Sequence, residues 1–185
     1  GSKFRRVWFK IQEGAPEGMK RLRYWDLAST APKPGADPDY TAGALLGTRG
    51  DGVFYLLDMR RMRGSPREVE ALIEQTAKLD GKVVTIRMEQ EPGASGVAMI
   101  DHYARNVLAG YSFLGVKVTG EKEIRANPLS SAAESGNIIL KLGSWVGAFL
   151  DEAEAFPIGS HDDQVDAASG AHSELALGRV AKVYV

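Results

Sequence analysis

Residues 21–28 read RLRYWDLA, a run of apolar and aromatic side chains that carries one acid, Asp26. Aromatic residues favour β-strands, whereas Asp disfavours them and is rarely buried without a partner. The run therefore predicts a strand whose acid needs an explanation. Asp26 is either structural, paired with Arg21 or Arg23 or capping the following turn, or it is a functional carboxylate.

The pattern around this strand predicts an α/β fold with a mixed sheet. Further β-rich runs at 41–48 and 53–62 are joined by Arg49–Gly52, whose glycines favour a hairpin, so an antiparallel meander is expected. Strand and helix patterns then alternate, which implies added parallel strands with helices on the faces of the sheet. The later strands are expected at 82–88, 111–118 and 137–142. The helices are expected from Ser65-Pro66 onward, with Glu68 at capping-box spacing, at 95–108, with Val97 on the apolar face, at 121–135, interrupted near Pro128, and at 145–155 and 160–177. Residues 31–39 are expected to form a loop, and 180–185 a short apolar tail.

Length and composition indicate one globular domain over residues 1–185. The chain has 44% hydrophobic and 25% charged residues, as soluble domains do. It lacks cysteine, which excludes disulfides, zinc–thiolate sites and a cysteine nucleophile. No apolar run approaches the roughly 20 residues of a spanning helix, so no membrane partner is expected. Residues 1–20 are expected to form a basic strand and linker, and Gly1-Ser2 is typical of an expression remnant on an excised fragment.

Positive charge is concentrated in two stretches, although the net charge is only −1. Seven basic residues and two acids precede Asp26. A run of arginines follows the third strand: Arg60, Arg61, Arg63 and Arg67. A basic rim around an acidic centre attracts phosphates and keeps the centre rich in carboxylates. The alternative is a solvated surface of mixed charge.

Two acids follow the strand expected at 82–88. Glu89 and Glu91 are two positions apart, so strand alternation puts both carboxylates on one face. Like charges side by side repel each other, and a cation relieves that repulsion. The two acids are either solvent-facing or part of a site, since α/β proteins place sites where strands run into glycine-rich turns.

Residues 160–166, SHDDQVD, hold three aspartates in five positions. Ser160 is a good N-cap, Asp163 has capping-box spacing, and acids in a first turn favour the helix dipole, so capping is one explanation. Three aspartates exceed what capping requires, however. Asp162 and Asp166 lie one helical turn apart, and Asp163 shares a side with Asp166, which suits a helix that presents carboxylates to a metal.

Carboxylates on two strands and a late helix could converge on one edge of the sheet. Hard oxygen ligands with one nearby histidine, His161, favour Mg²⁺ or Mn²⁺ over Zn²⁺. Two such ions about 3.5–4 Å apart support in-line displacement at phosphorus by water. His161 is expected to orient a carboxylate or contact a phosphate, and His102 and His172 are expected on helix surfaces. The sequence contains no ATPase phosphate loop and no serine nucleophile elbow.

Several segments match one family in combination: YWDLA at 24–28, DYTAG at 39–43, EQEPGASG at 89–96, RANP at 125–128, FP at 156–157 and HDDQVDA at 161–167. They resemble the C-terminal nuclease domain of the large terminase subunit of tailed bacteriophages. The resemblance implies a ribonuclease H-like fold with a two-metal site. It also implies an endonuclease that cuts concatemeric double-stranded viral DNA during genome packaging, in the cytoplasm of the infected bacterium.

The resemblance further implies roles for the acids. Asp26 is expected to bridge two Mg²⁺ or Mn²⁺ ions. Glu91 or Glu89 is the second ligand, with Glu91 slightly favoured because it lies nearer the turn. Asp163 with Asp162 is the third. We also expect one ion to bind firmly and the second to be recruited only with phosphate present.

Supporting residues and partners follow from the same resemblance. Asp166 and His161 are expected to support the ligands from outside the metal shell. DNA contacts are expected from the loop Pro32 to Tyr40, from the Arg49–Gly52 hairpin, and from Arg60, Arg61 and Arg63. The expected partners are an ATPase domain of the same full-length chain, the portal protein and the small terminase subunit.

Two other classes stay open. One is another nuclease of the same fold, a junction resolvase or a transposase-like strand-transfer enzyme. The other is a non-catalytic DNA-binding or portal-docking module in which the acids are only helix caps.

Overall fold

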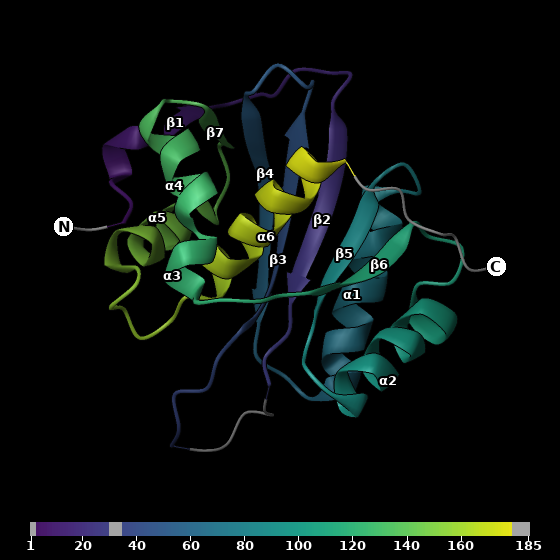
Figure 1. Cartoon of the computed structure of the whole chain (residues 1–185). Coiled ribbons are helices and arrows are strands. Elements are labelled where there is room, and N and C mark those ends of the chain that lie inside the picture. Colours follow the sequence, from purple (N-terminus) through teal and green to yellow (C-terminus); the bar gives the residue numbers. More distant parts are fainter. Residues whose placement is uncertain (1–2, 30–34, 179–185) are drawn as a thin grey trace.

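One mixed sheet of seven strands organises the molecule (Figure 1). The computed structural model describes residues 3–29 and 35–178. The strands are β1 (Lys10–Gln12), β2 (Lys20–Asp26), β3 (Thr41–Thr48), β4 (Phe54–Met62), β5 (Thr85–Gln90), β6 (Phe113–Lys117) and β7 (Ile138–Lys141), and their order is β1-β7-β4-β3-β2-β5-β6. β2, β3 and β4 form the antiparallel meander, and the other pairings are parallel. The predicted mixed α/β sheet is confirmed.

Helices cover both faces of this sheet. They are α1 (Pro66–Asp80), α2 (Ala94–His102), α3 (Lys122–Arg125), α4 (Asn127–Glu134), α5 (Val146–Ala155) and α6 (Asp163–Leu177), with a 3₁₀ turn at Arg6–Trp8 and a π-helical turn at Tyr103–Val107. α6 crosses the sheet in front of β3 and β2 in Figure 1, with α4 and α5 beside it. α1, α2 and the π-helical turn form a second core on the other face.

Strand alternation divides β2 between the two cores. Leu22 and Tyr24 pack in the core with α6, whereas Trp25 packs in the core with α1. Gly43, beside Trp25 on β3, leaves room for the indole, because a Cβ at this position would lie 2.5 Å from the ring. Asp26 is the next residue in the alternation after Tyr24, so it lies on the α6 face.

The same rule orients β5. Ile86 and Met88 belong to the core with α1, whereas Arg87 reaches the other face and lies 3.5 Å from Glu174 of α6. Glu89 follows Arg87 in this alternation and therefore shares the α6 face with Asp26. Trp25 pairs with Met88 in the parallel ladder, which places Asp26 and Glu89 side by side in register.

The ends of several strands meet at one edge of the sheet. Asp26 pairs with Ala42, Thr41 with Met62, and Gln90 with Lys117, so the carboxyl ends of β2, β4, β5 and β6 lie together. We call this the carboxylate edge. The Arg49–Gly52 hairpin lies at the opposite edge, because Lys20 at the start of β2 pairs with Thr48 at the end of β3.

Most of the local predictions are confirmed. The β3 and β4 runs, the glycine hairpin with positive φ at Gly50 and Gly52, and the break near Pro128 agree with the sequence pattern. So does α1, where Ser65 and Glu68 form both bonds of a capping box. None of the helices among the described residues is long and apolar enough to span a membrane.

Other predictions need correction. α6 begins at Asp163 with Asp162 as N-cap, so the expected start at Ser160 and its cap are wrong. Val97, expected on the buried face of the 95–108 helix, is exposed. His172 is buried at 7% exposure with its ring 4.5 Å from that of Phe54, so its surface placement is wrong. Residues 31–34 of the expected loop and the tail 180–185 lie outside the described residues.

Candidate metal centre

Asp26 ends β2 as a partly buried acid on the α6 face. The structural explanation by Arg23 does not hold, because Arg23 is bound at 2.8 Å both to Asp58 and to Asp80. Among the ion pairs of the described residues, none joins Asp26 to Arg21. The carboxylate of Asp26 therefore has to be stabilised by something other than the arginines of its own strand.

Glu89 lies next to Asp26 in the sheet, and a tyrosine of the same strand as Asp26 holds its side chain in place. Its carboxylate accepts a hydrogen bond from the Tyr24 hydroxyl at 3.3 Å, and Arg125 Nη1 lies 3.7 Å away. The Glu89 side chain is only 12% exposed. Glu91, by contrast, follows the end of β5 and is exposed, although it lines a cavity together with Glu89.

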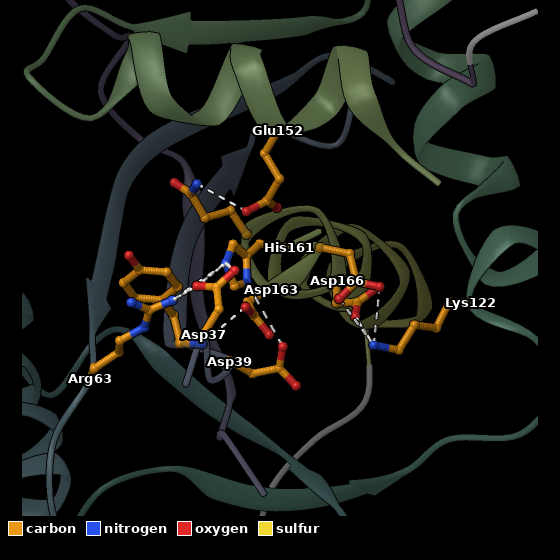
Figure 2. A network of polar contacts seen from close by, with 11 residues as sticks. Asp37, Asp39, Arg63, Lys122, Glu152, His161, Asp163 and Asp166 are labelled. Atoms are coloured by element: carbon orange, nitrogen blue, oxygen red, sulfur yellow. Dashed lines mark hydrogen bonds and ion pairs between the residues drawn. The ribbon is translucent and has the colours of Figure 1, made fainter. Parts of the chain in front are cut away.

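The first turn of α6 brings the aspartates to the same edge. Asp163 is buried at 5% exposure and accepts a hydrogen bond from the Tyr40 backbone N–H at 3.0 Å. Asp166, also buried, contacts Lys122 Nζ at 2.9 Å (Figure 2). Asp162 contacts the same ammonium at 3.1 Å. The aspartates thus point to one side of the helix start.

Burial and mutual repulsion raise the pKa of several of these acids. Burial raises the pKa of Asp26 well above its usual value, and the charges of Glu89, Asp166 and Asp163 raise it further. Burial and the charge of Asp162 raise the pKa of Asp166 to about 7, although its hydrogen bond from Lys122 lowers it. Burial also raises the pKa of Glu89 and of Asp163. Carboxylates from two strands and one helix therefore lie within electrostatic reach of one another.

These residues fit divalent cations. The donor set is largely buried and rich in carboxylate oxygen, and its acids outnumber the neighbouring Lys122 and Arg125, which suits Mg²⁺ or Mn²⁺. His161 adds a nitrogen: its Nε2 contacts Asp37 at 2.9 Å, while its buried Nδ1 has no hydrogen-bond partner. Ligand atoms of Asp39, His161 and Asp163 lie within 4.8 Å of one another. His161 therefore borders the acids.

The arginines expected to contact DNA are not all at this edge. Arg61 and Arg63 stack on the Tyr40 ring, with centroid distances of 4.3 and 3.9 Å, and Arg63 also contacts Asp37 at 2.7 Å. Arg60 contacts Asp58 at 3.0 Å. Arg49 lies in the hairpin at the opposite edge of the sheet. Of the four arginines expected to contact DNA, Arg61 and Arg63 are therefore the ones at the carboxylate edge.

The structure brings Asp26, Glu89, Asp162 and Asp163 together and adds Asp166 to them, while Glu91 stays at the rim. Sequence reasoning missed the polar residues that surround the acids: Tyr24, Asp39, Lys122, Arg125 and Glu152. Glu152 of α5 accepts the Val165 backbone N–H at 2.6 Å and so anchors the first turn of α6. Lys122 lies 40 positions before Asp162 along the chain, and no local pattern marks it.

The chain matches the family described as terminase RNaseH-like domain over residues 23–175. It is similar to the large terminase nuclease domain of Thermus phage P74-26, with 15% identity and a TM-score of 0.67 over all of both chains. It is also similar to the large terminase nuclease of thermophilic phage G20c with bound magnesium, at 18% identity and a TM-score of 0.61 over 94% of this chain and 97% of that one.

A large terminase from another thermophilic bacteriophage is similar over 94% of this chain but only 44% of its own, with 13% identity and a TM-score of 0.64. No curated protein matches the chain in sequence. The family match covers most of the chain, and the seven-stranded sheet agrees with it. The chain therefore belongs to the family of terminase ribonuclease H-like domains.

Proposed function

We propose that this chain is a metal-dependent endonuclease domain that cleaves concatemeric double-stranded viral DNA during genome packaging. The observation that carries the proposal is the convergence of Asp26, Glu89 and the α6 aspartates at one edge of the sheet. Burial and mutual repulsion raise the pKa of several of these acids, as expected of a site that needs cations as counter-charge. The shared fold with terminase nucleases supports the same reading.

We propose that the acids hold two Mg²⁺ or Mn²⁺ ions. Asp26 would be a ligand to both ions, Glu89 or Glu91 would be the second ligand, and Asp163 with Asp162 would be the third. Burial beside Asp26 favours Glu89 over Glu91. Bound ions of this kind lower the pKa of an attacking water and neutralise charge on the departing oxygen.

The remaining groups position the ligands and the substrate. Tyr24 fixes Glu89 through its hydroxyl, and the Tyr40 N–H fixes Asp163. His161 supports the α6 acids from the side of Asp37. Arg61 and Arg63, which flank Tyr40, are placed to neutralise phosphates of the bound duplex.

The wider context is part of the same proposal. Residues 1–185 form one nuclease domain of a longer chain, since the similar large terminase that is matched over 44% of its length extends well beyond the matched part. We propose an ATPase domain in that chain, and the portal protein and small terminase subunit as partners. The place of action is the cytoplasm of the infected bacterium.

Cleavage of supercoiled plasmid with Mg²⁺, Mn²⁺ or a chelator tests the function. We expect nicking and linearisation with either ion, none with chelator, and loss of both activity and Mn²⁺ binding in Asp26→Asn with the fold intact by circular dichroism. A folded wild-type domain that never cleaves under these conditions contradicts the proposal. Preference for branched over linear DNA would favour a junction resolvase instead.

A further inference from the structure

Lys122 places a positive charge inside the acidic centre. It is the first residue of α3, and its side chain crosses from α3 to the start of α6 (Figure 2). Its Nζ lies 3.1 and 3.2 Å from the two carboxylate oxygens of Asp162 and 2.9 Å from Asp166. Its charge also acts on Asp26 and Asp163. One ammonium therefore faces acids of both the strand and the helix.

The positive charge is distributed unevenly over the acids. Lys122 pairs with Asp162 and Asp166, and Arg125 lies near Glu89. No lysine or arginine of the described residues forms an ion pair with Asp26 or Asp163. The Asp26–Asp163 side is therefore the more open to a first divalent ion, while the Asp162–Asp166 side already carries a counter-charge.

Holding α3 against α6 does not by itself account for this lysine. The Ser169 hydroxyl of α6 donates to the Arg125 carbonyl at 3.0 Å and already ties the two helices together. The Lys122 side chain is 50% exposed and Asp162 is 27% exposed, so their ion pair is open to solvent, whereas Asp166 is buried. Ion pairs with this much exposure add little stability, about 0–1 kcal/mol in typical cases.

We propose that Lys122 is an internal counter-ion that keeps a second divalent cation out of the centre until DNA is bound. This inference rests on the proposed metal-dependent function and adds its regulation. An ammonium a few ångströms from a divalent cation repels it. The lysine stem is long, flexible and half exposed, so its head can leave the acids for a DNA phosphate. The DNA-free centre then binds one ion, and it binds the second ion only when DNA is present.

Calorimetric titration of Mn²⁺ into the DNA-free domain tests this role. We expect one strong site in the wild type, and in Lys122→Met a second site whose affinity rises by about tenfold or more. Lys122→Arg, which keeps the charge, should titrate like the wild type. Lys78→Met is the matched control, because it removes the same charge from an exposed i,i+4 pair with Glu74 on α1.

A short DNA duplex supplies the second arm of the experiment. The duplex should raise the affinity of the second Mn²⁺ site in the wild type and should change the affinity of that site in Lys122→Met much less. Titration of Lys122→Met that matches wild type, or shows weaker binding, overturns the inference. Lys122→Gln repeats the charge removal should the methionine variant unfold before the titration temperature.

The two proposals fail in different ways. A wild-type domain that neither binds Mn²⁺ nor cleaves plasmid removes the proposed function and this inference with it. A wild type that binds Mn²⁺ and cleaves, beside a Lys122→Met variant with unchanged Mn²⁺ affinity, removes only the role of Lys122.

Discussion

Glu89 and Glu91 carry the same side chain two positions apart, yet their surroundings differ. Glu89 lies within β5, is 12% exposed and accepts the Tyr24 hydroxyl, whereas Glu91 follows the strand and is exposed. Burial raises the pKa of Glu89, so its charged form is strained in the absence of a cation. A divalent ion therefore relieves more repulsion at Glu89 than at Glu91.

We predict that Glu89→Gln lowers the rate of plasmid cleavage by at least about a hundredfold, as loss of one charge-stabilising group in an active site does. Glu91→Gln should lower it by about tenfold, at the low end of what changes outside the metal shell cost. Both amides keep the volume of the side chain, so folding is preserved. Initial rates of nicking in Mn²⁺ measure the difference, and a larger loss in Glu91→Gln would reverse the assignment.

The sequence could predict which acids converge, but not which of them are buried and which are exposed. Strand alternation treats Glu89 and Glu91 alike, and only the end of β5 at Gln90 separates them. Asp166 is predicted to support the ligands from outside the metal shell, and the sequence does not show that it is buried against Lys122. Contacts across 40 positions of chain, such as Lys122 with Asp162, leave no local periodicity.

At the scale of elements, the closeness of α6 to β2 sets the geometry of the centre. Gly170 lies over the Tyr24 ring, and a Cβ there would be 2.4 Å from the ring atoms. Asp166 precedes Gly170 by one helical turn. The glycine therefore lets the helix approach the strand closely enough for Asp166 to face Asp26.

We predict that Gly170→Ala destabilises the domain by about 1–3 kcal/mol, because the added methyl overpacks the contact between helix and strand. It should also weaken Mn²⁺ binding, since α6 moves away from Asp26. Urea denaturation and calorimetry measure the two effects. Gly147→Ala in α5 is the control: a Cβ there meets no atom within 4 Å, so it should add about 0.5–1 kcal/mol of stability. A Gly170→Ala variant as stable as Gly147→Ala would refute this account.

The start of α6 shows why one element boundary could not be predicted. Ser160 has the right residue type and spacing for a cap, but Glu152 of α5 accepts the Val165 N–H and the Gln164 side-chain amide instead. A carboxylate from another helix thus satisfies a donor that sequence rules assign to a local cap. α1 has no such competitor, and there the Ser65–Glu68 capping box was predicted correctly.

At the scale of the molecule, the two edges of the sheet differ in charge. The acids, Arg61 and Arg63 lie at the carboxylate edge, whereas Arg49 lies in the hairpin at the other end of β3. A near-zero net charge hides this separation. We therefore expect the duplex to lie across the carboxylate edge, where the arginines that flank Tyr40 meet phosphates beside the acids.

The concentration of acids at one edge also links stability to pH and metal. Burial and the charge of Asp162 raise the pKa of Asp166 from 3.8 to about 7, although the hydrogen bond from Lys122 lowers it. Between these two values the folded chain binds more protons than the unfolded chain. The contribution of Asp166 to the free energy of unfolding therefore falls as pH rises through this window and is lost above about 7. A bound cation would replace the proton and remove the loss.

We predict that, without metal, Asp166→Asn exceeds the wild type in thermal midpoint by a margin that grows from pH 5 to pH 8, because the amide mimics the protonated acid at every pH and does not ionise in the unfolded chain. Groups whose pKa is lowered, such as Asp37 and His172, act equally in both proteins and cancel in the difference. Saturating Mg²⁺ near pH 8 should reverse the order, since only the wild type keeps the carboxylate. Scanning fluorimetry across pH measures both effects, and a difference in midpoint that does not change with pH would show that Asp166 is not held in a repulsive cluster.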